Sequence, residues 1–487
     1  MTDGRLVVVS NRLPNLKTGD QWKRGKVPSS GGLVSALLPV MEKSGKGIWM
    51  GWSGKSVSPA KSGTVHKTDH PVVKLVGMDL SDEEVNKYYN GFCNRSLWPM
   101  FHCFQGRTRM DGDEQDIYFK VNEKFGKALM DQLQPDDTVW VHDYHMIPLG
   151  RYLRLNGFKG PLGFFLHIPF PPLEMIEILP DPLWFMDAWL YYDLVGFHTD
   201  RYEENYYEVM ERLMLGLREG DRLYAGNRQQ KVLTAPIGIE LSIYDPKLES
   251  RDRSARKKGI RPEIPGCRVA LSVDRLDYTK GIPERMGSFE YFLKTRKDWR
   301  RKIALIQICS PSRTKVKEYI EQKELVDSMV GRINGQHAEH DWMPIRYLYR
   351  TYGQSDLARF YRDSDIALVT PLRDGMNLVA MEYVAAQRPE SPGVPVLSRF
   401  TGISEHLSEA VLVNPYIPES VAEGMERALN MPLAERKDRH QAMMSFINRN
   451  TSDQWADNFM ESLQEAHNQN KKLVSIIPTY PNSQSSG

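Results

Sequence analysis

The fold is decided by the stretch Ile366-Ala367-Leu368-Val369-Thr370-Pro371-Leu372-Arg373-Asp374-Gly375-Met376-Asn377-Leu378. Its apolar beginning, 366–370, is typical of a strand that is buried on both faces of a parallel sheet. The chain then turns at Asp374-Gly375 and enters an amphipathic stretch over 378–387. Because ligands bind at the carboxyl ends of parallel strands, the loop between them is a candidate binding site.

The same strand–loop–helix pattern recurs along the chain. Short runs rich in Val, Ile, Leu and Phe alternate with amphipathic stretches, and this alternation predicts a doubly wound α/β fold. The predicted strands are 5–10, 138–142, 163–167, 194–198, 232–237, 268–273, 303–309, 366–370, 394–397 and 410–413. The predicted helices include 32–42, 122–133, 203–217, 283–295 and 378–387.

So many strands require two sheets, and a chain of 487 residues is long enough for roughly two to three domains. The segment Pro236-Ile237-Gly238-Ile239 is followed by a polar stretch, 245–265, before the strand at 268. We therefore expect a first Rossmann-like domain over 1–239 and a second over 240–450. A disordered tail is expected over 471–487, which ends in polar and small residues.

The composition excludes several classes of protein. Lys and Arg number 64 against 62 Asp and Glu, so there is no basic excess for nucleic acid or a membrane surface. No apolar run approaches the length of a membrane span, and the run at 6–9 is too short for a signal segment, so a cytoplasmic location is expected. The four cysteines lack zinc spacing and are expected to be buried, reduced thiols.

Three segments near predicted strand ends suit phosphates and sugars. Gly31-Gly32 opens a helix whose N–H groups can approach a phosphate, although a plain loop fits this pair as well. Arg275 and Lys280 share one loop, and two cations there suit a diphosphate leaving group, the alternative being a solvated charge pair.

The loop after 366–370 adds carboxylates to these cations. Asp374 could hold sugar hydroxyls beside the N–H groups of Asn377, Leu378 and Val379 at a helix N-terminus. Glu382 lies about one turn further, where a carboxylate could bind both ribose hydroxyls. An ordinary acid in the first turns of a helix is the alternative for Glu382.

Two other segments contain histidines. In Val141-His142-Asp143-Tyr144-His145 the spacing is no metal signature by itself, so a sugar-hydroxyl or acid–base role suits Asp143 better. His167 ends a predicted strand before a Pro-rich loop and could face a cleft, although a structural histidine fits equally. Asp111-Gly112-Asp113 has the form of a metal–nucleotide clamp, but no strand precedes it and we interpret it as a loop.

Taken in order, these segments resemble the trehalose-6-phosphate synthases. The resemblance runs from about residue 6 to 467, and its motifs are Val-Ser-Asn-Arg (9–12), Gly-Trp-Ser-Gly (51–54), Val-His-Asp-Tyr-His (141–145), Phe-Phe-Leu-His-Ile-Pro-Phe-Pro (164–171), Arg-Leu-Asp-Tyr-Thr-Lys-Gly (275–281) and Thr-Pro-Leu-Arg-Asp-Gly-Met-Asn-Leu-Val-Ala (370–380). The resemblance implies the GT-B fold, in which two Rossmann-like domains face an interdomain cleft. It also implies that a last helix, about 452–467 within the segment 451–470, crosses back to the first domain.

The family transfers glucose from a nucleotide sugar, usually UDP-glucose, to glucose 6-phosphate with retention of the α configuration. The resemblance assigns the donor to Gly31, Gly32, Arg275, Lys280, His167, Tyr352, Asp374, Asn377, Leu378, Val379 and Glu382. It assigns the acceptor to Arg12, Trp52, Tyr89, Trp98, Asp143 and Arg313. Arg275, Lys280, Asp143 and His167 are the implied catalytic residues, and backbone at Tyr352 would contact the base.

In this scheme the fixed cations stabilise the departing diphosphate, so no cofactor or metal is required. The expected partners are UDP-glucose and glucose 6-phosphate, together with other copies of the chain in a homo-oligomer such as a tetramer. One alternative is a synthase with another phosphorylated acceptor, such as a glucosylglycerol-phosphate synthase. Another is a catalytically silent regulatory homologue, which the intact set Arg275, Lys280, Asp374 and Glu382 disfavours. The identity of the nucleotide base leaves no trace in the sequence.

Overall fold

The computed structural model describes residues 4–14, 32–45, 47–69, 73–246, 260 and 266–476. The chain divides into two compact units. One comprises Pro14–Val40 and Pro236–Trp455, and the other comprises the segments up to Leu13, Met41–Ala235 and the chain from Ala456 onward. We call the unit that contains β1 the first unit and the other the second unit.

The second unit is built on a six-stranded sheet in which every neighbouring pair of strands is parallel. Its strands are β11 (Arg268–Arg275), β12 (Ile303–Ser310), β13 (Ile345–Tyr349), β14 (Ile366–Val369), β15 (Val394–Ser398) and β16 (Val411–Val413). Their spatial order, β13-β12-β11-β14-β15-β16, is the 3-2-1-4-5-6 order of doubly wound dinucleotide-binding folds. The nearly continuous apolar runs of these strands are therefore explained by burial on both faces.

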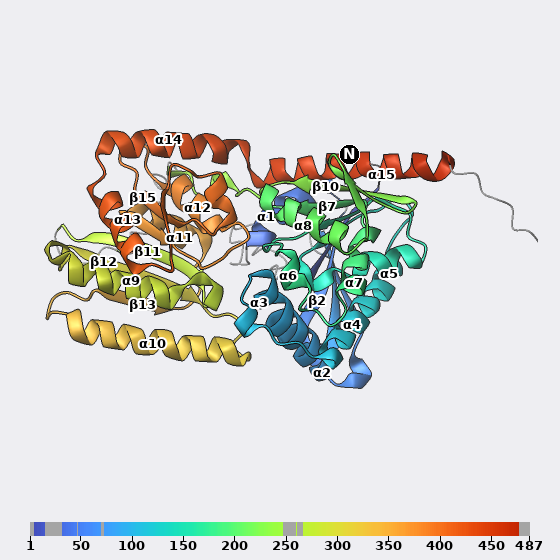
Figure 1. Cartoon of the computed structure of the whole chain (residues 1–487), viewed down its shortest axis with the longest axis horizontal. Coiled ribbons are helices and arrows are strands. Elements are labelled where there is room, and N and C mark those ends of the chain that lie inside the picture. The colour runs from blue at the N-terminus through green and yellow to red at the C-terminus, as the bar shows by residue number, and fades with distance from the viewer. Residues whose placement is uncertain are drawn as a thin grey trace, which may run out of the picture. The chain divides into compact units, whose positions relative to one another are not determined.

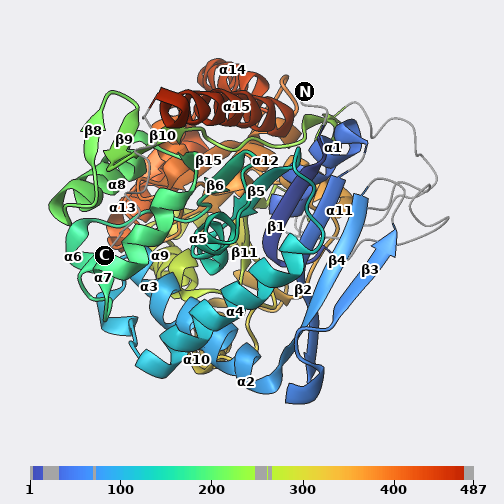
Figure 2. The same cartoon turned by 90° about the vertical axis from the view of Figure 1, so that its right-hand side faces the viewer.

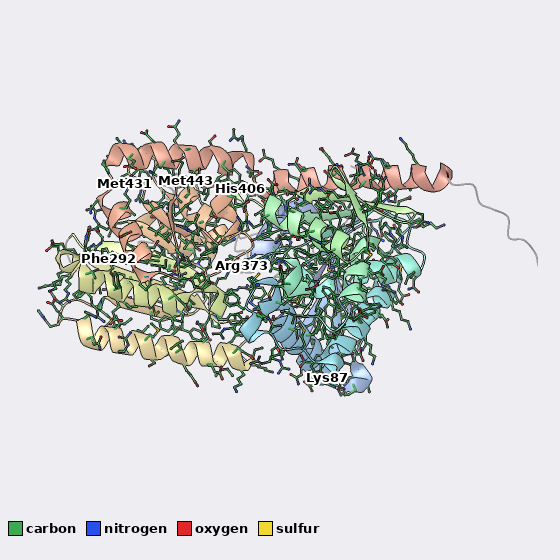
Figure 3. All side chains as sticks on the ribbon, in the orientation of Figure 1. Lys87, Phe292, Arg373, His406, Met431 and Met443 are labelled. Carbon is green, nitrogen blue, oxygen red and sulfur yellow. The ribbon has the colours of Figure 1, made fainter. Side chains whose placement is uncertain are left out.

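Helices cover this sheet in two layers (Figure 1). They are α9 (Ile282–Thr295), α10 (Lys317–His337), α11 (Gln354–Asp363), α12 (Leu378–Ala386), α13 (Pro418–Asn430) and α14 (Leu433–Arg449). Right-handed crossovers place α9 and α10 on one face and α11 and α12 on the other. Helix α13 packs on α9, and α14 packs on α12. Phe292 and Met431, both labelled in Figure 3, belong to the apolar core beneath the first of these layers.

The first unit is built on a ten-stranded sheet, and Figure 2 labels strands from both of its edges, β8 and β3. Its strands are β1 (Leu6–Arg12), β2 (Gly47–Val57), β3 (Val65–Asp69), β4 (Val73–Ser81), β5 (Thr138–His142), β6 (Leu162–Phe165), β7 (Leu194–Phe197), β8 (Leu217–Glu219), β9 (Arg222–Ala225) and β10 (Arg228–Thr234). The order is β3-β4-β2-β1-β5-β6-β7-β10-β9-β8, and its parallel centre, β4-β2-β1-β5-β6-β7, again follows the 3-2-1-4-5-6 order. Antiparallel strands lie only at its two edges, β3 at one and β9 and β8 at the other.

The helices before residue 236 vary more in length, and they belong to the first unit except for residues 32–40 of α1, which belong to the second. They are α1 (Gly32–Ser44), α2 (Asp82–Glu84), a π-helix over Val85–Leu97, α3 (Trp98–Phe101), α4 (Gly112–Met130), α5 (Leu149–Leu155), α6 (Leu173–Ile176), α7 (Pro182–Asp187) and α8 (Asp200–Arg212). The interpretation of Asp111-Gly112-Asp113 as a loop is wrong. Asp111 caps α4, because its carboxylate accepts the backbone N–H of Asp113 at 2.9 Å and that of Glu114 at 3.4 Å.

The last helix, α15 (Ser452–Ile476), belongs to the first unit from Ala456 onward and lies along its sheet (Figures 1 and 2). It runs past the end expected at 470, so the tail predicted from 471 begins in helix, and 477–487 lie outside the described residues. Within the described part of the chain, no helix is long and apolar enough to cross a membrane. All four cysteines are thiols, three of them buried and Cys103 half-buried.

Candidate active site

Each sheet contains one position where the direction of strand progression reverses, and ligands of doubly wound sheets bind at that position. In the second unit it lies between β11 and β14, and in the first unit between β1 and β5. Arg275 ends β11 and Lys280 lies in the loop that follows it, Asp374 and Asn377 follow β14, Arg12 ends β1, and Asp143 follows β5. Topology alone therefore brings these six predicted residues to two switch points, one in each unit.

In the second unit, the loops after β11 and β14 are joined to each other. The backbone N–H of Leu372 donates to the carbonyl of Thr279 at 2.8 Å. Gly281 has φ +61°, and a Cβ at this position would lie 2.8 Å from the carbonyl oxygen of Thr370. Only glycine satisfies both conditions without strain. The two loops therefore form a single platform.

On this platform a lysine, an aspartate and an asparagine meet. Lys280 Nζ forms an ion pair with the carboxylate of Asp374, and Asn377 Nδ2 donates to the same carboxylate oxygen at 3.0 Å. Asn377 has φ +76° and precedes the first turn of α12, which holds Leu378 and Val379. A cation thus lies beside a helix N-terminus whose first N–H groups have no partner within the helix.

A buried carboxylate, Asp277, binds the arginine that follows β12 and lies near the cations Arg275 and Lys280. It accepts hydrogen bonds from Arg313 Nη1 at 2.9 Å and from the Tyr319 hydroxyl at 3.0 Å. Burial by itself would raise the pKa of Asp277, but Arg313, Arg275 and Lys280 outweigh it and hold that pKa below its usual value. Asp277 is therefore ionised near neutral pH and fixes the direction of the Arg313 side chain.

Sequence reasoning missed Arg285, the fully buried guanidinium beneath the platform. It donates to Asp274 at 2.6 Å, Thr370 Oγ1 at 2.8 Å, the Lys280 carbonyl at 2.9 Å and Gln307 at 3.1 Å. Arg285 thereby joins the ends of β11, β12 and β14 to the loop that carries Lys280. An arginine inside a helix, with its partners 5 to 85 residues away, gave no local signal of this role.

Glu382, on α12, faces two tyrosines rather than a cation. The Tyr361 hydroxyl donates to its carboxylate at 2.9 Å, and Tyr244 contacts the same group. Burial raises the pKa of Glu382, although the two hydroxyl groups lower it in part. Tyr352 follows β13, where its ring meets Phe360 edge-on at 5.1 Å.

In the first unit, Arg12 ends β1 and its side chain is exposed. Its guanidinium carbon lies 5.5 Å from the centre of the Trp52 ring, within the range of a cation–π contact. Gly54 has φ +85°, and a Cβ there would lie 2.9 Å from Arg12 Nη2. The Trp52–Gly54 segment of β2 therefore packs closely against the side chain of Arg12.

A row of aromatic rings extends from Arg12. Trp52 and Tyr89 have ring centres 5.6 Å apart, and Tyr89 and His145 are stacked at 6.0 Å. Trp98 belongs to a neighbouring group and lies 5.8 Å from Tyr144. Flat aromatic faces of this kind suit the apolar faces of sugar rings.

Tyr89 lies inside the π-helix, and Trp98 directly follows it. The backbone N–H of Trp98 donates to the carbonyl of Cys93, five residues earlier. Asn94 Nδ2 donates to the Tyr89 carbonyl at 2.6 Å, while its Oδ1 accepts the Tyr144 hydroxyl at 3.0 Å. Even single π-turns are rare and often occur at functional sites.

Asp143 lies at the end of β5 in a strained conformation, with φ +72° and ψ 163°. Residues other than glycine rarely adopt this region, and such strain gathers at functional sites. One carboxylate oxygen accepts the backbone N–H of Tyr144 at 3.1 Å and that of His167 at 3.4 Å. Asp143 is thus tied to the segment that contains His167.

His167 belongs to a group of three histidines that follow or end β5, β6 and β7. His142 Nδ1 lies 3.0 Å from His167 Nε2, and the rings of His167 and His198 are 5.4 Å apart. Burial lowers the pKa of His142 to about 3 and lowers the pKa of His167 well below its usual value. Without any proton transfer, a neutral imidazole can still donate a hydrogen bond to a sugar hydroxyl or accept one from it.

The structure thus gathers Arg275, Lys280, Arg313, Asp374, Asn377 and Glu382 in the second unit, and Arg12, Trp52, Tyr89, Trp98, Asp143 and His167 in the first. Gly32 is the first residue of α1, whereas Gly31 lies outside the described residues. Among the described residues, no group of three or more His, Cys, Asp or Glu side chains could hold a metal ion. Besides Arg285, sequence reasoning missed His198, Tyr244 and Tyr361.

Two doubly wound units with cations and carboxylates at their switch points, and with aromatic rings beside one of them, are typical of the nucleotide-sugar-dependent glycosyltransferases of GT-B fold. Comparison with known proteins narrows this class. Residues 4–465 match the model of Glycosyltransferase family 20, and the chain belongs to this family. The predicted α/β fold and glycosyltransferase class are confirmed.

The relatives that the comparisons find are trehalose-phosphate synthases. The chain is 40% identical over 460 residues to the trehalose-6-phosphate synthase of Sinorhizobium fredii, which covers 94% of this chain and 98% of that protein. It is similar in structure to an alpha,alpha-trehalose-phosphate synthase (UDP-forming) from Burkholderia xenovorans in complex with glucose-6-phosphate, with TM-score 0.88, 37% identity and coverage of 95% and 100%. An E. coli structure bound with UDP-2-fluoro glucose gives TM-score 0.85 at 36% identity, with coverage of 95% and 99%.

Proposed function

We propose that this chain transfers glucose from UDP-glucose to glucose 6-phosphate and so forms α,α-trehalose 6-phosphate and UDP. The names of its relatives support this reaction, and two structural neighbours contain the corresponding ligands, glucose-6-phosphate and a UDP-glucose analogue. The single observation in this chain that carries the proposal is the cationic platform of the second unit. It combines Lys280, Arg275 and a helix N-terminus beside the sugar-binding candidate Asp374.

Those groups suit a departing diphosphate. Negative charge grows on the β-phosphate as the bond to the glucose C1 breaks, and preorganised cations stabilise this charge most strongly in the transition state. Glu382 would bind the ribose, and Asp374 and His167 the glucose hydroxyls. The buried pairs that fix Arg313 and the Lys280 loop would keep the cations in place before the donor arrives.

Retention of configuration follows from attack on the face that UDP leaves. The C1 hydroxyl of glucose 6-phosphate forms the new C–O bond, the bond from the donor C1 to the β-phosphate oxygen breaks, and that oxygen takes the hydroxyl proton. No enzymic base is needed, which agrees with the low pKa of His167. Asp143 would then orient the acceptor rather than carry its proton.

The acceptor side requires donors for a phosphate dianion and flat surfaces for a sugar. Arg12 beside Trp52 and Tyr89 offers both within the first unit, and Arg313 would add a second guanidinium. We propose that these residues, with Trp98, select glucose 6-phosphate. A different phosphorylated acceptor is not favoured by the relatives, and a silent regulatory role does not suit a chain that keeps the whole donor set.

The test is to incubate purified protein with UDP-glucose and glucose 6-phosphate in EDTA, and to measure UDP release together with the mass of the product. A phosphorylated disaccharide that forms only with both substrates is expected, at a rate that EDTA leaves unchanged because protein cations take the place of a metal. Absence of product with every nucleotide glucose and sugar phosphate would contradict the proposal. Loss of the rate in EDTA alone would contradict only its metal independence.

Two further parts of the proposal concern the protein in the cell. We propose a cytoplasmic enzyme, since four thiols fit a reducing compartment. We also propose a homo-oligomer such as a tetramer. Fractionation of cells and light scattering on the purified protein test these points independently of activity.

A further inference from the structure

The sheet of the first unit contains a socket that admits one ring of the last helix. Phe459 of α15 is fully buried, and its ring lies where side chains on β6 and β7 would otherwise project. A Cβ on Gly163 would lie 2.8 Å from Phe459 Cε1, and a Cβ on Gly196 would lie 2.5 Å from Phe165 Cδ2 and 2.9 Å from Phe459 Cε2. Neither glycine has a positive φ, so close approach of the ring, and not backbone conformation, requires them.

Two large rings form the rest of this socket. Trp140 is stacked on Phe459 with ring centres 4.5 Å apart and planes at 12°, and Phe165 meets it edge-on at 5.7 Å. The strand register places Trp140 directly beside Gly163, and Phe165 directly beside Gly196. The socket is therefore a continuous patch on one face of β5, β6 and β7.

The three histidines continue the same face toward the carboxyl ends of these strands. His142 follows Trp140 by two residues, His167 follows Phe165 by two, and His198 follows Gly196 by two, which is the spacing of one face of a strand. The contacts agree with this spacing, since the Trp140 and His142 ring centres are 4.5 Å apart. The corresponding distances from Phe165 are 4.8 Å to His167 and 5.0 Å to His198.

We propose that Phe459 is a positioning residue for donor glucose, acting through Trp140 and Phe165 to hold the His142–His167 pair in its binding orientation. The two rings are stacked with centres 5.3 Å apart and share a hydrogen bond between ring nitrogens, whose geometry changes when either ring rotates. Trp140 and Phe165 prevent that rotation only while the ring of Phe459 fills the space between them. This inference rests on the proposed function, because it assumes that His167 contacts the glucose of the donor.

The test compares Phe459→Leu with Leu463→Ala. Leu463 is a matched control, since it is also fully buried, lies one turn further along α15 and would lie 3.0 Å from a Cβ on the same Gly163. For Phe459→Leu we expect kcat/KM for UDP-glucose to fall about tenfold, since a misplaced contact costs catalysis. The KM for glucose 6-phosphate and the Kd for UDP, which has no glucose, should change less than about twofold.

Leu463→Ala should lower the thermal midpoint by at least as much while leaving the donor kinetics unchanged. If Phe459→Leu does not fold, Phe459→Met replaces it. Donor kinetics of the Phe459 variant that match those of Leu463→Ala would overturn the inference. Failure of the wild-type protein to form product would count against the proposed function instead.

Discussion

The two switch points hold their functional candidates by different physical means. In the second unit the cations are fixed by buried charge, with Asp277 and Arg285 making several hydrogen bonds each. In the first unit Arg12, Tyr89 and His167 are fixed mainly by ring packing and by unusual backbone, including a π-helix and the strained Asp143. The half that would meet a diphosphate is thus prearranged electrostatically, whereas the half that would meet a sugar is prearranged by shape.

The largest expected effect separates these two means of support. Arg285→Met leaves the buried Asp274 carboxylate without its partner, and we expect the free energy of unfolding to fall by about 3–5 kcal/mol. Denaturant titration of the purified protein measures it. Adding Asp274→Asn should recover part of the loss, and Arg427→Met, in a largely exposed ion pair with Glu435, should cost no more than about 1 kcal/mol. An equal loss of unfolding free energy in the two arginine variants would show that the buried network contributes no more to stability than a surface ion pair.

The next largest expected effect is on catalysis, through the cation of the platform in the second unit. Lys280→Ala removes the cation beside Asp374, and kcat should fall by about 10²–10³-fold, as for other groups that stabilise transition-state charge. Steady-state rates of UDP release check this. The matched control is Lys294→Ala on α9, whose amine pairs with Glu290 at 2.6 Å and which should keep full activity. A drop below tenfold for Lys280→Ala would place the diphosphate elsewhere.

A smaller effect tests whether shape positions the first unit's arginine. Gly54→Ala places a methyl group against Arg12, so the KM for glucose 6-phosphate should rise about tenfold, which corresponds to 1.4 kcal/mol, with little change for UDP-glucose. Gly63→Ala is the matched control. Its φ of +82° gives similar strain, but its nearest neighbour is Lys124 Cδ at 3.4 Å. Both variants should lose similar thermal stability, and an equal rise in KM for both would remove Arg12 from the acceptor site.

The smallest effect concerns pH. The folded-state pKa of Glu382 is raised by burial, so the folded protein binds a proton more readily than the unfolded chain, and this group destabilises the fold as pH rises through that pKa. Glu382→Gln should therefore raise the thermal midpoint at neutral pH by about 1–3 °C. The gain should vanish as the pH falls below the ordinary carboxyl range, and the KM for UDP-glucose should rise. A gain that persists in acid would mean that the carboxylate charge is not its source.

Fold and site differed in how much the sequence revealed. The Val- and Ile-rich strands β5, β11 and β12 were predicted to within two residues, because burial on both faces leaves an unbroken apolar run. β2 was missed, since it mixes Gly, Ser and Lys with its two tryptophans and leaves the sheet core before its end. The exposed β8–β9 hairpin was missed for the opposite reason, as it has almost no apolar run at all.

The candidate residues could be found because they follow strands, where topology determines the location of a site. The residues that hold these candidates in place could not be found from their position after a strand. The partners of Arg285 come from four elements, and the Gly163–Phe459 contact joins residues almost 300 positions apart in the chain, so only the folded structure brings them together. The roles of Tyr352, Trp98 and the other carried-over residues stay predictions.

The π-helix of the first unit also limits how this protein can change in length. A deletion of one residue within Val85–Leu97 would favour the ordinary i→i−4 hydrogen bonds over i→i−5, and in an α-helix each residue advances the direction of side chains by about 100°. Tyr89 and Trp98 would then no longer point as they do, even though neither had been replaced. The number of residues in this segment, and not only their identity, therefore sets the directions of these two rings.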